Sequence, residues 1–467
     1  MNIINRNLII AIAFALSFFQ WQSIYCQVWQ TVGVEGFSIA EARHADICID
    51  NYNVPYVAFC DSLYGYKATV MKFDGSNWVN VGSPGFSNGP ASHFDFMSLA
   101  FDSNNIPYIS YEDSSLTTKA VVRKFDGSNW IPVGIEGFST SMCSTVSIAI
   151  DSSDTPYVVY KDYAAGGKAM VMKFDGVNWI SVGGGPVTSS SIDHTWIRFD
   201  SNNNPLISYT DAGAGTNANV KFFDGVSWNS VGTPDFAGQN VWYPYLAIDH
   251  NDTPYVIFNY FPTMGPGPYI TGGVMKFDGT SWITVGASSF PDFTGSAPKI
   301  TFDRHNNPYV IYVDSVNSFK ATVITFDGTN WISVGNVGFS DGGIGFPGIA
   351  IDSNDLLYVS YGDYSLGAKL SVKSFSVATM ISSYTDKNDG ITIYPNPSNE
   401  MLNIKCDDIH ETTFMQIIDN SGRIIYETEL TQIQTAVSVG NLANGLYILK
   451  VFTNNKFNSY KKLVIQH

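Results

Sequence analysis

A few aromatic and cationic side chains break a repeat that otherwise explains most of the chain. Trp196, Arg198, Trp242, Tyr243 and Tyr260 fall within two successive copies of that repeat. Aromatic side chains beside a cation suit a sugar ring or an exposed peptide side chain, because they join a large apolar face to a polar edge. Two histidines hold comparable positions, so the candidate ligand-binding set is His44, His194, Trp196, Arg198, Trp242, Tyr243 and Tyr260. Irregular packing between unequal repeats is the alternative explanation.

The repeat is marked by the motif Trp-x-x-Val-Gly, which occurs seven times at steps of 49 to 54 residues. Its tryptophans are Trp29, Trp78, Trp130, Trp179, Trp228, Trp282 and Trp331. Each motif is followed by an apolar alternation that ends in Asp, then by two runs rich in Val, Ile and Tyr, and then by Phe-Asp-Gly. Four strand-like runs in a unit of about fifty residues are typical of a β-propeller blade. We label the four strands A to D, with A ending at the Asp and D carrying the Trp.

The seventh unit lacks its own strand D, whereas a lone Trp-x-x-Val-Gly stands near the N-terminus at Trp29. We therefore predict an all-β chain: a seven-bladed β-propeller of four-stranded blades, closed by the N-terminal strand, followed by a small immunoglobulin-like β-sandwich. Closure of this kind removes exposed sheet edges. The predicted boundaries are a signal peptide at 1–26, the propeller at 27–377, a linker at 378–390 and a C-terminal domain at 391–467.

Charge and composition narrow the possible partners. The N-terminus has a positive residue, Arg6, before an apolar run over 8–19, as in a secretory signal peptide. No later segment is apolar for long enough to cross a membrane. The net charge of −16 argues against nucleic acid as a partner. The cysteines match no zinc pattern, so we expect neither a metal nor a cofactor.

Antiparallel order within each unit predicts two different faces. The A–B and C–D turns lie on one face, and the B–C and D–A loops lie on the other. Both length insertions of the repeat fall in D–A or B–C loops, so we call this the variable face, where binding residues are expected. An Asp and a Lys six residues apart flank the B–C loop in five units, first at Asp61 and Lys67. This pattern predicts either a structural ion pair or a charged ring that contacts a ligand.

Enzyme motifs are missing from the sequence. No nucleophile elbow, phosphate-binding glycine loop or zinc-binding histidine pair occurs. The Asp-x-Asn turns lack the glycine and the terminal carboxylate of a calcium loop. The motif Phe-Asp-Gly-x-x-Trp is similar to the Asp-box of sialidase-like propellers, but its Asp-to-Gly spacing is one residue short. A glycosidase needs two carboxylates that face one bond, and the few carboxylates that the repeat does not explain, Glu41 and Asp95, form no evident pair.

The last 77 residues, 391–467, carry none of the blade pattern. Alternating runs between Asn-Ser-Gly and Ala-Asn-Gly turns predict a small β-sandwich. Several motifs occur in order, at Tyr394-Pro395-Asn396-Pro397, at Gly422-Arg423, at Gly445-Leu446-Tyr447 and over 461–465. Together they make the tail resemble the type A C-terminal sorting domain of the type IX secretion system. The resemblance implies export across the outer membrane of a Bacteroidetes-type bacterium, with the tail recognised by the secretion machinery and the cargo released or attached to surface lipopolysaccharide.

The expected protein is thus secreted or held at the outer-membrane surface, with the type IX secretion machinery as a partner. We expect non-catalytic binding or adhesion to a glycan or a protein. Two alternatives remain: an extracellular polysaccharide-active enzyme, either a glycosidase or a lyase, and a structural adhesin whose blades only space or oligomerise. A glycan array with Trp196→Ala and Trp242→Ala variants distinguishes binding at the predicted patch from these alternatives.

Overall fold

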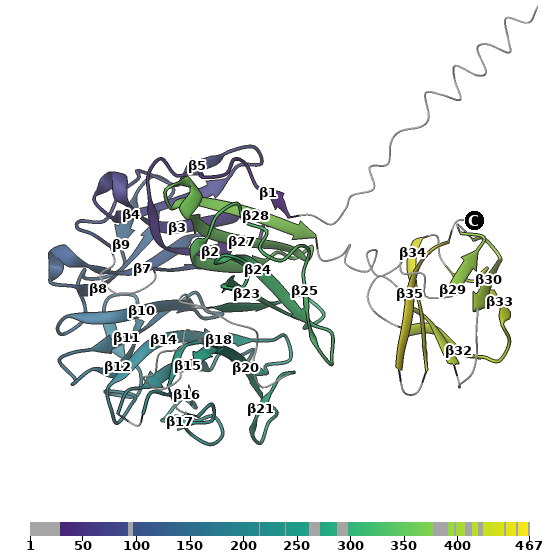
Figure 1. Cartoon of the computed structure of the whole chain (residues 1–467). Coiled ribbons are helices and arrows are strands. Elements are labelled where there is room, and N and C mark those ends of the chain that lie inside the picture. The colour runs from purple at the N-terminus through teal and green to yellow at the C-terminus, as the bar shows by residue number, and fades with distance from the viewer. Residues whose placement is uncertain are drawn as a thin grey trace, which may run out of the picture.

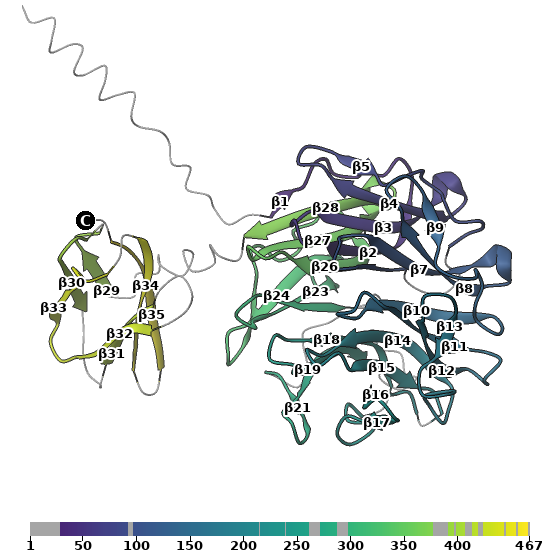
Figure 2. The ribbon, with the colours of Figure 1, turned by 180° about the vertical axis from the view of Figure 1, so that it is seen from behind.

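The structure is a computed structural model of the chain (Figures 1 and 2). It describes residues 29–91, 97–213, 215–238, 240–260, 271–286, 298–376, 391–396, 398–406, 413–418, 424–442, 445–453 and 456–465. The predicted signal peptide and linker lie outside these ranges, as do Asp95, Pro397, Gly422 and Arg423.

Residues 29–376 form seven four-stranded antiparallel sheets, each with its strands in the order A-B-C-D. The A strands are β2 (Ala42–Ile49), β6 (Ser98–Phe101), β10 (Cys143–Ile150), β14 (Ile192–Phe199), β18 (Val241–Ile248), β22 (Lys299–Phe302) and β26 (Ile344–Ile351). The B strands are β3 (Pro55–Asp61), β7 (Pro107–Asp113), β11 (Pro156–Asp162), β15 (Pro205–Asp211), β19 (Pro254–Tyr260), β23 (Pro308–Asp314) and β27 (Leu356–Asp363).

The outer half of each sheet holds the C and D strands. The C strands are β4 (Lys67–Phe73), β8 (Lys119–Phe125), β12 (Lys168–Phe174), β16 (Asn217–Phe223), β20 (Thr271–Phe277), β24 (Lys320–Phe326) and β28 (Lys369–Ser376). The D strands are β5 (Trp78–Asn80), β9 (Trp130–Pro132), β13 (Trp179–Ser181), β17 (Trp228–Ser230), β21 (Trp282–Thr284), β25 (Trp331–Ser333) and β1 (Gln30–Thr31).

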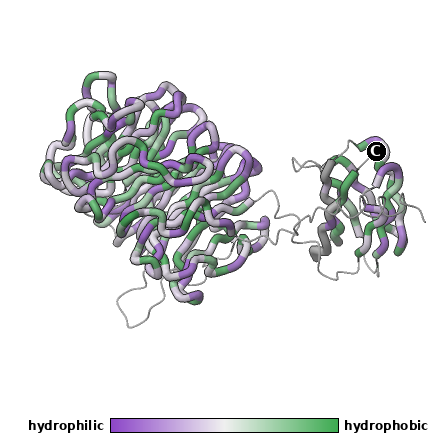
Figure 3. The backbone as a smooth tube through the Cα atoms, turned by 90° about the horizontal axis from the view of Figure 1, so that it is seen from above, coloured by the Kyte–Doolittle hydropathy of each residue, from purple (hydrophilic) through white to green (hydrophobic). Residues whose placement is uncertain are grey.

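The sheets are arranged as the blades of a propeller. Each A strand packs against the A strands of the sheets before and after it, and β26 packs against β2, so the seven A strands form a closed ring. We call the region that these A strands enclose the central channel. B strands such as β3 are buried at every residue, because neighbouring blades cover both of their faces. Hydrophobic and hydrophilic stretches alternate along the backbone (Figure 3), as expected for buried strands joined by polar turns. We number the blades 1 to 7 from β2–β5 onward.

The N-terminal strand closes the ring, as the sequence predicts. β1 pairs antiparallel with β28, with Gln30 opposite Ser374 and Thr31 opposite Lys373. The ladder continues beyond the strand, because Val32 N–H donates to the carbonyl of Val372 at 2.9 Å. Figures 1 and 2 show β1 beside β28. Blade 7 is therefore built from both ends of the propeller.

The Trp-x-x-Val-Gly motif joins each blade to the next. Every motif tryptophan donates its Nε1–H to the carbonyl of the motif valine one blade earlier, at 2.7 to 3.0 Å, and Trp29 closes the circle onto Val334. The motif glycine lies against the tryptophan and phenylalanine of the next blade. A Cβ on Gly134 would approach Phe174 Cε2 to 2.8 Å, and Gly134 has a φ of +68°. Each residue of the motif is thus explained by an inter-blade contact.

A second closed ring runs through the A–B turns. In every blade, the backbone N–H that follows the repeat Asp donates to an Asn or Asp side chain of the next blade, at 2.7 to 3.2 Å. The acceptors are Asn53, Asn105, Asp154, Asn203, Asp252, Asn306 and Asp355, and all have φ between 59° and 67°. Asn and Asp tolerate this left-handed conformation and supply the acceptor oxygen, which explains their repetition at one position.

The Asp-Gly pair of Phe-Asp-Gly would suit a two-residue hairpin turn with two left-handed residues, but the C–D turns are longer. Phe73 pairs with Trp78, so four residues form the loop, and only the glycine, Gly75, has a positive φ. Asp74 instead accepts hydrogen bonds from the backbone N–H groups of Ser76 and Asn77, at 2.9 and 2.7 Å. The Asp of Phe-Asp-Gly is therefore a turn acceptor, and it does not supply a second left-handed residue.

The tail folds separately into two antiparallel sheets. One has the order β29-β30-β33, from β29 (Ile391–Tyr394), β30 (Met401–Cys406) and β33 (Gln434–Ser438). The other has the order β32-β31-β34-β35, from β31 (Thr413–Ile418), β32 (Ile424–Leu430), β34 (Gly445–Thr453) and β35 (Lys456–Ile465). Buried Leu402 and Ile404 of the first sheet share one core with Met415 and Leu449 of the second. The tail is therefore consistent with the predicted sandwich, and its immunoglobulin-like topology stays a prediction.

Candidate functional site

Exposed apolar side chains concentrate on the variable face. Among the described propeller residues, eighteen large hydrophobic side chains are exposed, and thirteen of them lie in D–A loops, in B–C loops or at the start of an A strand. Four of these are aromatic residues in B–C loops: Tyr64, Tyr163, Phe319 and Tyr364. Apolar side chains gathered on one surface indicate a binding face. The exposed apolar side chains therefore lie mostly on the same face that the variable loop lengths indicate as the binding face.

Five A strands contain a bulge near this face. The pairing register between strands A and B shifts in β2, β10, β14, β18 and β26. Each shift contains a residue with a left-handed φ of 48° to 57°: His44, Thr145, His194, Tyr243 and Phe346. A positive φ is rare for bulky residues, and a bulge re-aims the side chain that it carries. Three of the seven predicted site residues, namely His44, His194 and Tyr243, take this unusual conformation.

The bulges bring three predicted residues together between blades 4 and 5. The ring of His194 lies 4.0 Å from that of Tyr243 and 5.4 Å from that of Trp242, measured between centroids. Trp242 is 36% exposed, so part of its indole is open to solvent. We call these three residues the mouth cluster. His44 forms a separate contact with Phe346 between blades 1 and 7, at 4.8 Å.

Trp196 and Arg198 lie deeper than the sequence predicts. Trp196 is 6% exposed and packs edge-on against Tyr245 at 4.6 Å. Arg198 donates from Nη2 to the Tyr245 hydroxyl at 2.7 Å, and its guanidinium lies 5.2 Å from the Tyr245 ring. These two residues are therefore buried, and they do not share the exposed surface of Trp242.

Four further side chains form one cluster with Trp196. Lys299 is 1% exposed and pairs with Asp46 at 2.9 Å, and its ammonium lies 5.5 Å from the Trp196 ring and 5.9 Å from the Tyr245 ring. We call Asp46, Trp196, Arg198, Tyr245 and Lys299 the channel plug. Sequence reasoning missed Asp46, Tyr245 and Lys299. Four of the plug residues stand four positions before the repeat Asp, in a column that reads Asp46, Ser98, Ser147, Trp196, Tyr245, Lys299 and Gly348.

Tyr260 ends strand β19, opposite Val241 in the register. Its ring lies edge-on to Phe258 at 5.3 Å, and burial raises the pKa of its hydroxyl. The long loop that follows, 261–270, lies outside the described residues. Tyr260 is thus on the variable face of blade 5, one residue from the partner of Trp242.

The repeated Asp–Lys pairs are not ion pairs. Asp61 and Lys67 are opposite one another in the ladder, yet none of the five pairs lies within ion-pair distance among the described residues. Asp61 instead accepts from the N–H of Leu63 at 3.0 Å and caps the short turn η1 (Ser62–Tyr64). Asp113 and Asp363 cap η2 (Ser114–Leu116) and η3 (Tyr364–Leu366) in the same way. The Asp therefore shapes the B–C loop as a cap, and the prediction of a structural Asp–Lys ion pair is wrong.

A polar pocket of about 440 Å³ opens on the variable face between blades 1 and 2. Its lining comprises Arg43, His44, Cys60, Tyr66, Pro90, Ser114 and Thr118. Arg43 donates to Glu41 at 2.7 Å, lies 4.9 Å from the Tyr66 ring, and holds the pKa of the Glu41 carboxyl below its usual value. The Tyr66 hydroxyl also donates to Glu41, at 3.1 Å. Glu41 is therefore an orienting partner for Arg43 and Tyr66.

In the tail, the predicted motif residues meet the last strand. Asn396 accepts from the N–H of Val464 in β35 at 2.8 Å, and Ser398 donates its N–H to the carbonyl of the same valine. Tyr394 ends β29, Gly445 and Leu446 begin β34, and Tyr447 is buried. The segment around Tyr394–Asn396 is thereby fixed against the C-terminal strand.

Comparison with known proteins identifies the tail. Residues 392–466 match the family model of the secretion system C-terminal sorting domain. A search among curated proteins found no match. No helix in the described part of the chain is long and apolar enough to cross a membrane.

Several solved structures have similar folds at low identity. PorZ, a bacterial surface component of the type IX secretion system of Porphyromonas gingivalis, is 15% identical at a TM-score of 0.45, over 90% of this chain and 59% of PorZ. An ulvan lyase of polysaccharide lyase family PL25 is 12% identical at a TM-score of 0.49, over 75% of this chain and 95% of the lyase. The extracellular domain of a putative hybrid two-component system of B. thetaiotaomicron is 13% identical at a TM-score of 0.48, over 95% of this chain and 60% of that domain. This chain thus spans about three fifths of PorZ, and no function is carried over from these structures.

The tail indicates the location to which the protein is exported. A C-terminal sorting domain engages the type IX secretion machinery, and it indicates export to the cell surface or the medium. The chain is a propeller-like cargo carried by a type IX sorting domain.

Proposed function

We propose that the propeller is a non-catalytic glycan-binding module that acts outside the cell, with its ligand at the channel mouth on the variable face. The observation that carries this proposal is the mouth cluster. An indole that is one-third exposed offers a flat apolar surface for the C–H face of a sugar, and the polar edges of His194 and Tyr243 are beside it.

The channel plug supports a site of this kind. Lys299 and Trp196 are almost completely buried, and the salt bridge from Lys299 to Asp46 links blade 6 to blade 1. The side chains beyond the mouth cluster are therefore packed against one another, so a ligand would be held at the mouth.

Glycan-array binding of the exported protein tests the proposal. Trp242→Ala removes the exposed indole, and we expect it to weaken binding at least tenfold, or about 1.4 kcal/mol. Tyr52→Ala is a matched control, because Tyr52 is an exposed aromatic residue (78%) in an A–B turn on the opposite face. Binding that survives in Trp242→Ala would remove the mouth cluster as the site. An array without any ligand would favour a protein partner.

The pocket between blades 1 and 2 supports a second candidate, the eliminative cleavage of an acidic polysaccharide. Such a reaction needs a base near a sugar carbon and a cation that neutralises the adjacent carboxylate. His44 and Tyr66 are possible bases, and Arg43 is the cation. Incubation with polygalacturonate, followed by ultraviolet absorbance of unsaturated products, tests this candidate. Activity that Tyr66→Phe or His44→Gln abolishes would support it, and no activity in the unmodified protein would exclude it for this substrate.

A further inference from the structure

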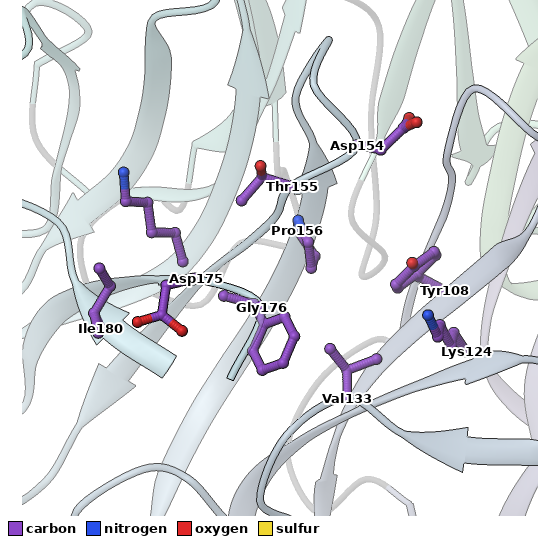
Figure 4. Close-up of a pocket in the computed structure, with 11 residues that line it drawn as sticks. Tyr108, Lys124, Val133, Asp154, Thr155, Pro156, Asp175, Gly176 and Ile180 are labelled. Atoms are coloured by element: carbon purple, nitrogen blue, oxygen red, sulfur yellow. The ribbon is translucent and has the colours of Figure 1, made fainter. Parts of the chain in front are cut away.

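A second cleft lies on the opposite face, where the repeat has constant length. It is found between blades 2 and 3 and has a volume of about 610 Å³. Figure 4 shows Tyr108 and Lys124 on one side of this cleft and Asp175 and Ile180 on the other, with Asp154 and Thr155 at a third edge. Its size is within the range of pockets that bury a small ligand.

The free charges of this cleft are its lysines. Lys124 and Lys173 both line it, and neither forms an ion pair among the described residues. Each ammonium lies over a tyrosine of its own blade, with Lys124 Nζ 5.8 Å from the Tyr108 ring. The two carboxylates of the cleft are already engaged. Asp154 accepts from the N–H and the hydroxyl of Ser103, and Asp175 accepts from two backbone N–H groups.

The apolar part of the lining comes from Val133, Phe174 and Ile180. These side chains line the same cleft as the two lysines. A ligand that fits must therefore combine a compact, partly apolar body with a group that accepts hydrogen bonds from ammonium donors. A sugar ring with an anionic substituent has this combination.

The repeat shows where else the same lining occurs. The residue opposite the first B-strand aromatic is Lys72 in blade 1, Lys124 in blade 2 and Lys173 in blade 3. In blades 4 to 7 the same position holds Phe222, Lys276, Thr325 and Ser374. Blades 1 and 2, like blades 2 and 3, therefore both carry a lysine at this position, whereas every other pair of neighbouring blades has one lysine or none. The three lysines form a basic row on a chain of net charge −16.

We propose that the lysine-flanked cleft between blades 2 and 3 on the constant face binds acidic sugar residues, carboxylated or sulfated, of an extracellular polysaccharide. The apolar lining contacts the ring of the sugar, and Lys124 and Lys173 contact its anionic group. The third lysine of the row, Lys72, allows the same polysaccharide chain to be held at a second point, which increases the overall affinity. This site is separate from the channel mouth and does not depend on it.

Calorimetry on the exported protein tests the proposal with three probes: oligogalacturonate, a sulfated galactan oligosaccharide and a neutral cello-oligosaccharide. We expect an acidic probe to bind, with an affinity that falls as salt increases. Lys124→Ala combined with Lys173→Ala should weaken this binding at least tenfold. Lys276→Ala is the matched control, because Lys276 lies over Tyr255 in the same geometry but in clefts without a second lysine. The control should stay within twofold of the unmodified protein.

Three outcomes would overturn the proposal: acidic probes that do not bind, equal binding of the neutral probe, or a double variant that binds as well as the unmodified protein. The preference between oligogalacturonate and the sulfated probe identifies the anion. Unfolding midpoints of the double variant and of Lys276→Ala show whether the fold is retained. Trp242→Ala should leave this binding unchanged, so a failure here is distinguishable from a failure at the channel mouth.

Discussion

Lys299 Nζ lies 2.9 Å from Asp46 Oδ1, although the two residues belong to blades 6 and 1 and are separated by blade 7. The intervening blade has Gly348 at the equivalent position, where a Cβ would approach Ser360 Oγ to 2.5 Å. A side chain at this position would meet Ser360 and Ile47. Asp46 also accepts from the N–H of Leu99 in blade 2, at 3.0 Å, so the pair links three of the seven blades.

Breaking this pair should destabilise the propeller strongly. Lys299→Met leaves Asp46 without its cation, and Asp46→Asn leaves a buried ammonium, so each should lower the free energy of unfolding by about 3–5 kcal/mol. The combined variant removes both charges and should recover most of the loss. Denaturant unfolding of the four proteins provides the double-mutant cycle. Losses that simply add would show that the two charges do not stabilise one another.

Trp29 should contribute to stability far more than its position near the N-terminus suggests. It is 5% exposed, donates to the carbonyl of Val334 and stacks on Phe339 at 4.1 Å. Trp29→Ala should therefore lower the free energy of unfolding by about 3–5 kcal/mol. Trp242→Ala, which truncates an exposed indole, should change it much less. Deletion of residues 27–33 with no change in melting temperature would contradict the closure of blade 7 by β1.

The glycine of Trp-x-x-Val-Gly should tolerate no side chain. Gly134 and Gly127 both have positive φ, at +68° and +97°, so an alanine at either position is strained. Only at Gly134 would the new Cβ meet another blade, 2.8 Å from Phe174, whereas nothing lies within 4 Å at Gly127. Gly134→Ala should therefore cost about 1–3 kcal/mol more than Gly127→Ala. Equal melting temperatures for the two variants would argue against the close approach.

The C–D turns predict an acid sensitivity. Backbone N–H groups lower the pKa of Asp74, Asp126, Asp175, Asp224 and Asp278. A carboxyl whose pKa is lower in the folded state stabilises the fold above its unfolded pKa of about 3.9, and this contribution is lost as the pH falls through the folded pKa. Replacing all five by Asn should flatten the fall of the urea midpoint below about pH 4. A profile parallel to that of the unmodified protein would contradict this assignment.

The repeat makes the fold predictable, because each of its residues has a contact that recurs in every blade. Trp78 and Gly82 mark strand D, Asp50 marks the A–B turn, and the lone Trp29 fixes both the number of blades and the closing strand. These contacts lie within one blade or between neighbouring blades, so the residues that make them recur at the blade period and can be recognised in a single sequence. Trp242 and His194 could be singled out from the sequence because they break the repeat, whereas their contact with one another could not.

Depth within the channel was not predictable. Trp196 and Trp242 look alike in the sequence, yet Trp196 stands four positions before its repeat Asp and Trp242 stands seven positions before its own. The bulge at Tyr243 exposes Trp242, whereas Trp196 follows its bulge and points inward. The pairing of Lys299 with Asp46 joins blades 6 and 1, which are far apart in the sequence, so it is a property of the closed ring. The prediction of Asp–Lys ion pairs was wrong because the Asp side chain accepts hydrogen bonds from N–H groups of the B–C turn, which are closer to it than the lysine is.

Hydroxyl-radical footprinting of the exported protein, with and without its tightest array glycan, tests the binding face most directly. The account predicts that the glycan protects Trp242 and Tyr243 from oxidation and leaves Tyr52 unprotected. Protection of Tyr52 without protection of Trp242 would contradict the assignment of ligand binding to the channel mouth.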